Sequence, residues 1–178
     1  LYSEDEIRQR VKEIAGRITK DYAGKTPILV GVLQGVVSFL ADLIREIKLP
    51  MRMDFIEIAR YGPNENPNQV EHGVKVTRDP ALSMEGQHVI LVEDIVDTGM
   101  TVQFLIAHLR SKNPASITVC TLLDKLARRM NATPIDYQGF EVPDEFLVGY
   151  GLDYNGLYRN LPEISILKAT ESKPDPSS

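Results

Sequence analysis

The chain has 178 residues, with 20 lysines and arginines against 25 aspartates and glutamates, and a formal net charge of −5. This length is most simply one domain, spanning residues 1–178, with a substantial hydrophobic core. Mild acidity argues against a general nucleic-acid or membrane-surface binder, and no apolar run is long enough to predict a membrane span. The single cysteine, Cys120, excludes an intrachain disulfide, so we expect a cytoplasmic protein and a buried thiol.

Strands and helices are predicted to alternate along the first two thirds of the chain. Ser3 and Glu6 form a capping box, and apolar residues then recur at helical spacing from Ile7 to Ile18. Apolar, β-prone runs predict strands at 27–33, 51–58, 88–93 and 116–123, with a short strand at 74–77. Helical patterns cover 36–47 and 101–111. We therefore predict an α/β fold with a central, mostly parallel sheet flanked by helices.

Three further segments do not follow this alternation of strands and helices. Glycine, proline and asparagine gather after residue 60, which favours a mobile lid over about 60–76. After Arg129 the pattern changes to short strands and turns, with strand candidates at 146–148 and 164–167, so we expect a small hood over about 124–167. The polar stretch 168–178 is predicted to be a disordered tail.

The most informative segment is the apolar strand that runs into three acids and then into a helix. Residues 88–101 read His-Val-Ile-Leu-Val-Glu-Asp-Ile-Val-Asp-Thr-Gly-Met-Thr. Glu93 and Asp94 are acceptors that suit two neighbouring hydroxyls, directly or through Mg²⁺. Thr98, Gly99 and Thr101 open the helix, where free backbone N–H groups favour an anion. Acceptors for a sugar beside donors for a phosphate describe a ribose 5-phosphate site.

Residues 92–99, Val-Glu-Asp-Ile-Val-Asp-Thr-Gly, resemble the motif with which type I phosphoribosyltransferases bind phosphoribosyl pyrophosphate (PRPP). Four later motifs resemble the hypoxanthine (guanine) phosphoribosyltransferases within that group: Leu-Leu-Asp-Lys at 122–125, the segment 137–144, Phe-Leu-Val-Gly-Tyr-Gly-Leu-Asp-Tyr at 146–154, and Tyr-Arg-Asn-Leu-Pro at 158–162. The resemblance runs from about residue 3 to about 167. It implies the type I phosphoribosyltransferase fold and the transfer of the 5-phosphoribosyl group from PRPP to hypoxanthine or guanine, which gives IMP or GMP and pyrophosphate.

The resemblance also implies roles for individual residues. Asp97 matches the catalytic general base at the purine N7. The residues implied to bind PRPP are Glu93, Asp94, Asp97, Thr98, Gly99, Thr101, Gln34, Gly35, Tyr61 and Arg159. Those on the purine side are Lys125, Phe146, Leu147 and Asp153. The implied cofactor is Mg²⁺, with one ion at Glu93 and Asp94 and a second ion, on pyrophosphate, at Asp153.

Two of the purine-side roles have a simple chemical basis. Lys125 would donate to O6, which favours 6-oxopurines over adenine because adenine presents an amino group there. Phe146 would stack on the base. In each case a less specific interpretation is open: the Lys125 ammonium could be solvated, and Phe146 could be an ordinary core residue.

This chain departs from the family pattern at the end of the first strand and in the lid. Gln34 stands before Gly35 where the family has lysine, and the peptide bond there is often cis in the family. In the lid, the family's Ser-Ser-Tyr-Gly is replaced by Ala-Arg-Tyr-Gly at 59–62. Arg60 could therefore supply the charge missing at Gln34. At Leu147 the family often has valine, which bears on whether guanine's 2-amino group fits.

Alternative functions remain at this point. A regulator with the same fold would keep the phosphate loop without needing Lys125 or Phe146, and an enzyme that prefers xanthine would keep Lys125. The implied partners are PRPP and a 6-oxopurine, with no nucleic acid or membrane. A homodimer or homotetramer is also implied.

Overall fold

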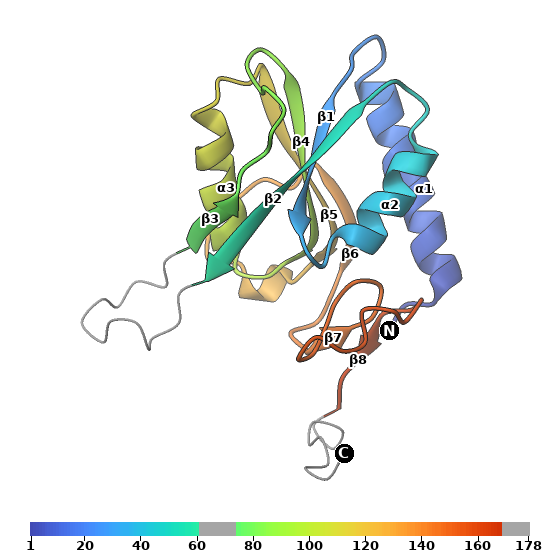
Figure 1. Ribbon diagram of the computed structural model, residues 1–178. Helices are drawn as coiled ribbons and strands as arrows, with labels where there is room; N and C mark the ends of the chain where they lie inside the picture. Colours follow the sequence, from blue (N-terminus) through green and yellow to red (C-terminus); the bar gives the residue numbers. More distant parts are fainter. Residues whose placement is uncertain (61–73, 169–178) are drawn as a thin grey trace, which may run out of the picture.

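The computed structural model describes residues 1–60 and 74–168 of the chain. A six-stranded sheet lies between helices, and a small two-stranded sheet lies beyond one of its ends (Figure 1). In chain order the elements are α1 (Glu4–Asp21), β1 (Ile28–Leu33), α2 (Val37–Glu46), β2 (Arg52–Arg60), β3 (Val74–Arg78), β4 (His88–Val96), α3 (Met100–Arg110), β5 (Ser116–Asp124), the 3₁₀ turn η1 (Leu126–Arg128), β6 (Tyr137–Glu141), β7 (Leu147–Val148) and β8 (Ser165–Ile166).

The strand order of the large sheet is β3-β2-β1-β4-β5-β6. Only β3 runs antiparallel to its neighbour, so the prediction of a mostly parallel sheet is confirmed. From β1 the chain moves outward to β2 on one side, and from β4 it moves outward to β5 on the other. Because the winding reverses between β1 and β4, a crevice forms beyond their carboxyl ends, where ligands of such sheets bind.

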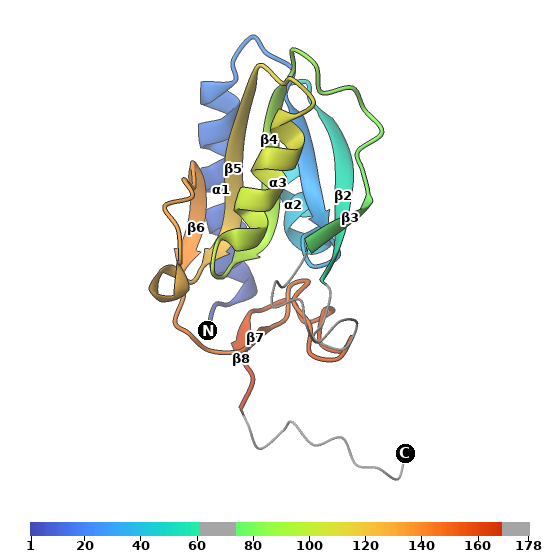
Figure 2. The same ribbon diagram turned by 90° about the vertical axis from the view of Figure 1, so that its left-hand side faces the viewer.

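The sheet is buried on both faces. Figures 1 and 2 show α1 and α2 covering one face and α3 covering the other. Alternate residues of one strand enter different clusters: Leu29 packs with α1 and α2, whereas Ile28 and Val30 pack with α3. This double burial explains why the strands read as continuous apolar runs. Cys120 is fully buried in the first of these clusters, as predicted, and burial raises the pKa of its thiol.

The hood is built on β7 and β8, which pair antiparallel beyond the carboxyl ends of the sheet (Figure 1). Tyr2 and Ile164 exchange backbone hydrogen bonds, so the first residues pair with the hood. The Tyr150 hydroxyl donates to Asp42 of α2 at 2.6 Å. One boundary needs correction, because β6 falls within the predicted hood but pairs with β5 at the edge of the central sheet.

Some predictions lie outside the described residues. These are Tyr61, the part of the proposed lid at 61–73, the Arg60 side chain, and residues 169–178 of the proposed tail. The short strand expected at 74–77 is present as β3. Within the described ranges, no helix combines the length and apolar character needed to cross a membrane.

Candidate active site

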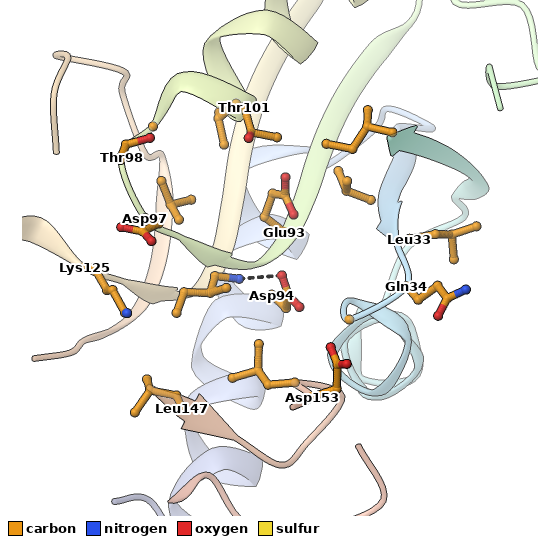
Figure 3. Close-up of a pocket in the computed structure, with 18 of the residues that line it drawn as sticks. Leu33, Gln34, Glu93, Asp94, Asp97, Thr98, Thr101, Lys125, Leu147 and Asp153 are labelled. Carbon is orange, nitrogen blue, oxygen red and sulfur yellow. Dashed lines mark hydrogen bonds between the residues drawn. The ribbon is translucent and has the colours of Figure 1, made fainter. Parts of the chain in front are cut away.

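A cleft of about 630 Å³ lies between the carboxyl ends of the sheet and the hood. Figure 3 shows that residues from β1, β4, the start of α3, the end of β5 and the hood surround it. Every predicted site residue within the described ranges lines this cleft: Gln34, Gly35, Glu93, Asp94, Asp97, Thr98, Gly99, Thr101, Lys125, Phe146, Leu147, Asp153 and Arg159.

Strand β4 runs further than the sequence suggested. It was expected to end at Glu93, but Ile95 and Val96 still pair with β5. Glu93 and Asp94 therefore belong to the strand, where neighbouring side chains alternate between faces. Figure 3 shows their carboxylates on opposite sides of the β4 ribbon. The two acids reach the cleft from different sides and do not form one flat pair of acceptors.

Asp94 sits where β1, β4 and the hood meet. A Cβ at position 35 would lie 1.7 Å from Oδ2 of Asp94, so only glycine leaves room for this carboxylate. A Cβ on Gly151 of the hood would lie 2.1 Å from the Gly35 carbonyl oxygen, and Gly151 has a φ of +100° that disfavours side chains. The peptide bond between Leu33 and Gln34 is cis, as the resemblance implied.

Burial sets the protonation of Asp94. It raises the pKa of this carboxyl from 3.8 to about 6, against the lowering effects of the Ile95 N–H, which donates to Oδ1 at 2.7 Å, and of the Arg159 charge. The charge of Asp153 raises the pKa further. The cleft thus holds a carboxylate that is poorly solvated until a cation or a hydroxyl enters.

The loop before α3 has the geometry expected of a phosphate site. Gly99 has a φ of +83° and immediately precedes Met100, the first residue of α3. A Cβ at Gly99 would lie 2.6 Å from Oδ1 of Asn131, so the segment after β5 packs directly on this loop. Thr98 accepts the Met130 N–H at its carbonyl oxygen, at 3.0 Å. The positive end of the α3 dipole borders the cleft at this point.

Lys125 and Asp97 enter the cleft from neighbouring strand ends. The Lys125 N–H donates to the Val96 carbonyl at 2.9 Å, which ties the end of β5 to the end of β4. Lys125 is only 8% exposed, so the solvated alternative is wrong. Its ammonium lies 3.8 Å from Oδ1 of Asp144. Oδ1 of Asp97 lies 2.7 Å from Nε of Arg128, although the angle is not that of a hydrogen bond.

The hood contributes one exposed aromatic ring and one apolar contact. Phe146 is 51% exposed, so it is not a core residue, and its ring meets Tyr154 edge-on at 5.5 Å between centroids. An aromatic face left open in a cleft is suited to stacking on a flat ligand. Leu147, the next residue, is buried in β7 at the border of the cleft.

Asp153 and Arg159 form an ion pair within the hood. One guanidinium nitrogen of Arg159 lies 2.8 Å from Asp153 Oδ1, and another donates to the Gly151 carbonyl at 2.6 Å. The Gly156 N–H donates to Oδ2 of Asp153 at 2.7 Å. Both carboxylate oxygens of Asp153 therefore already have partners within the protein.

The carboxylates around the cleft are suited to bind Mg²⁺ together with substrate oxygens. Glu93, Asp94 and Asp153 supply carboxylate oxygens, the ligands that Mg²⁺ prefers. Over residues 1–60 and 74–168, no three His, Cys, Asp or Glu side chains converge on one point suited to a metal. These acids fit an ion that takes one or two protein carboxylates and completes its shell with water and substrate oxygens.

Three polar residues near the cleft were not predicted as site residues: Arg128, Asn131 and Asp144. They contact Asp97, Gly99 and Lys125 respectively. Their positions follow from the turn after β5 and from the start of the hood. The sequence offered one signal, the adjacent Arg128 and Arg129 just after Lys125.

Comparison with known proteins agrees with this geometry. Residues 1–155 match the family model of the phosphoribosyl transferase domain. The chain therefore belongs to the phosphoribosyltransferase family. The hypoxanthine-guanine phosphoribosyltransferase of Bacillus subtilis (strain 168) is 43% identical over 168 residues, covering 94% of this chain and 92% of that protein. Within the family, the chain groups with the hypoxanthine-guanine phosphoribosyltransferases.

Two further relatives complete the comparison. The crystal structure of a hypoxanthine phosphoribosyltransferase from Staphylococcus aureus superposes with a TM-score of 0.90 at 38% identity, covering 98% of this chain and 93% of that one. The bifunctional protein TilS/HprT of Listeria innocua is 43% identical over 168 residues, which cover 94% of this chain. The chain spans only 26% of the length of that relative.

Proposed function

We propose how this cleft carries out the reaction of its family. As a hypoxanthine-guanine phosphoribosyltransferase of purine salvage, the chain joins hypoxanthine or guanine to the phosphoribosyl group of PRPP and releases pyrophosphate. The bond between the ribose C1′ and pyrophosphate breaks, a bond from C1′ to the purine forms, and the purine loses a proton. The observation that carries the assignment of roles is the convergence of acids, a helix N-terminus, a lysine and an open aromatic ring on one cleft.

The phosphoribosyl group would lie along the β4–α3 segment. The 5′-phosphate would accept hydrogen bonds from the first N–H groups of α3, with Thr98 and Thr101 adding hydroxyl donors and Gly99 allowing close approach. The ribose hydroxyls would donate to Glu93 and Asp94. Pyrophosphate would meet the backbone at Gln34 and Gly35 and the guanidinium of Arg159.

The purine would lie at the Asp97 and Lys125 end of the cleft, against Phe146 and Leu147. The Lys125 ammonium would donate to O6, and Asp97 would accept the proton from N7. The transition state carries positive charge on the ribose, which a nearby carboxylate also stabilises. Asp153, on the hood side of the cleft, would lie between the purine and the pyrophosphate.

Mg²⁺ is the proposed cofactor. Glu93 and Asp94 would hold one ion together with ribose oxygens of PRPP, and Asp153 would hold a second ion on pyrophosphate. The ion would neutralise the charge of the pyrophosphate leaving group. We also propose a homodimer or homotetramer in the cytoplasm, which light scattering of the purified chain and fluorescence imaging of a tagged chain would test.

The experiment that tests these roles measures product formation from PRPP and Mg²⁺ with hypoxanthine, guanine, xanthine and adenine in parallel. We expect turnover of hypoxanthine and guanine but not adenine, and a loss of about 10²–10⁴-fold in kcat for Asp97→Ala. Turnover of xanthine above hypoxanthine would establish the xanthine alternative. PRPP binding without turnover of any base would support the regulator and contradict the proposed roles.

A further inference from the structure

Four charged side chains of alternating sign form a row at the purine end of the cleft. Asp97 and Lys125 are its two ends, and Arg128 and Asp144 lie between them. Asp97 Oδ1 lies 2.7 Å from Arg128 Nε, Arg128 Nη1 donates to Asp144 Oδ1 at 3.1 Å, and that same oxygen lies 3.8 Å from Lys125 Nζ. The two outer groups line the cleft, whereas the two inner ones are not among its lining residues. The inner pair, Arg128 and Asp144, therefore joins the two outer groups without lining the cleft itself.

Local backbone geometry places Arg128 for this contact. The η1 turn follows Lys125 directly, and the Arg128 N–H donates to the Lys125 carbonyl at 2.9 Å. The turn carries the guanidinium back toward the loop after β4. There its fork contacts two acids at once, with Nε toward Asp97 and Nη1 toward Asp144. These two acids raise the pKa of the Arg128 guanidinium, so the bridge stays charged.

The spacing of the outer groups matters because of the shape of the base. O6 and N7 lie next to each other on one edge of a 6-oxopurine. A donor for O6 and an acceptor for the N7 proton must therefore stand at a fixed separation and point the same way. Lys125 and Asp97 come from different strand ends and have long or rotatable side chains, so the backbone alone does not set this separation.

We propose that Arg128 and Asp144 are positioning residues that hold Asp97 and Lys125 at the spacing of the O6–N7 edge. This proposal rests on the roles given above to Asp97 and Lys125. Asp144 draws the ammonium of Lys125 toward the hood, and Arg128 fixes one oxygen of Asp97, which leaves Oδ2 for the purine. The bridge thereby couples base recognition to proton removal.

The competing explanation is an ordinary surface ion-pair chain. The side chains of Arg128, Asp97 and Asp144 are 45%, 43% and 53% exposed, and exposed pairs contribute little to stability. The two explanations differ in what they predict. A surface chain leaves catalysis unchanged, whereas a positioning bridge changes catalysis while hardly altering the thermal midpoint.

The test uses Arg128→Gln, Asp144→Asn and the double variant, with Glu145→Gln as the matched control. Glu145 is an exposed acid next to Asp144, so its variant makes the same change in charge as Asp144→Asn. We expect kcat/KM for hypoxanthine to fall roughly tenfold in each single variant, with KM for PRPP unchanged. The double variant should lose little more, because both substitutions break one bridge. Arg128→Lys should not restore activity, since one ammonium cannot span both acids.

Several outcomes would overturn the proposal. These are single variants that match Glu145→Gln in kcat/KM, losses that multiply in the double variant, or full rescue by Arg128→Lys. Asp97→Asn and Lys125→Met are measured alongside. If those two variants keep wild-type activity, the roles assigned to the cleft have failed. If they lose activity while the bridge variants do not, only the positioning proposal has failed. Should Arg128→Gln not fold, Asp144→Asn is judged by the same criteria.

Discussion

The two ends of the cleft are built in different ways. The end proposed for the phosphoribosyl group comes mainly from one continuous segment, Glu93 to Thr101, which continues from β4 in the middle of the sheet. The end proposed for the purine shares Asp97 with this segment and adds Lys125 after β5 and Phe146 with Leu147 in the hood. The first contains the Asp94 carboxyl, whose pKa burial raises. The second is open, with an exposed aromatic ring.

The two ends of the cleft therefore meet different requirements for binding. A phosphate and a ribose need fixed donors and acceptors, which a strand and a helix N-terminus provide with little freedom to move. A flat base needs a stacking surface and two polar contacts on one edge, which side chains from different segments can supply only if something sets their spacing. Variants at the phosphoribosyl end should change KM for PRPP, and variants at the purine end should change KM for the base.

At the phosphoribosyl end, the largest effect is expected for Gly35→Ala. The new Cβ would lie 1.7 Å from Oδ2 of Asp94, so the carboxylate must move. We expect a fall of about 10²-fold or more in kcat/KM for PRPP, because displacement of about 1 Å at a catalytic centre has that effect.

Gly16→Ala is the matched control for this substitution. Position 16 lies within α1, and an added Cβ there meets nothing within 4 Å. The control should keep its activity and gain about 0.5–1 kcal/mol in the free energy of unfolding. Steady-state kinetics of both variants measure the change in activity, and thermal melts measure the change in stability. Wild-type kinetics for Gly35→Ala would contradict the packing described here.

The second effect concerns Asp94 and pH. The unfolded carboxyl has a pKa near 3.8 and the folded one near 6, so between these values the folded protein keeps a proton that the unfolded chain has lost. The stabilisation is therefore fully present below about pH 4 and is lost as pH rises through about 6. Asp94→Asn removes this dependence. Its gain in unfolding free energy over the wild type should grow from near zero at pH 4 to about 3 kcal/mol at pH 7.5.

Urea melts of both proteins in the presence of a metal chelator, at pH 4, 6 and 7.5, would measure this difference. A gain that is the same at all three pH values would mean that burial of the carboxylate is not its cause. The variant should also bind PRPP with Mg²⁺ poorly. Asp94→Asn would therefore raise the free energy of unfolding while it weakens substrate binding.

At the purine end, Lys125→Met keeps the apolar stem and removes the ammonium. Loss of a donor to O6 should lower kcat/KM for hypoxanthine by about 10- to 100-fold and leave KM for PRPP unchanged, because a charged hydrogen bond contributes about 1.5–3 kcal/mol. Discrimination against adenine should shrink as well. Competition assays with hypoxanthine and adenine provide the readout, and a rise in KM for PRPP alone would place Lys125 at the wrong end of the cleft.

The smallest effect is expected for Gln34→Lys, which restores the charge found in the family. An exposed cation beside pyrophosphate contributes up to about 1 kcal/mol, so KM for PRPP should fall by roughly two- to fivefold. The gain should weaken as salt is added, since salt screens exposed charges. Gln34→Met serves as a neutral control. An equal gain in that control would show that charge is not the reason.

The sequence alone determined the parallel sheet and the family, because apolar periodicity and contiguous motifs are local properties of the chain. It placed the end of β4 too early, since acids normally mark a loop and only pairing with β5 keeps Ile95 and Val96 in the strand. It assigned β6 to the hood, because a short strand does not reveal its neighbour. Only the tertiary structure brought Gly35 against Asp94, opened the Phe146 ring to the cleft, and joined Asp97 to Lys125 through Arg128 and Asp144. These contacts join residues from separate segments, and their distances depend on how the strand ends and the hood pack together.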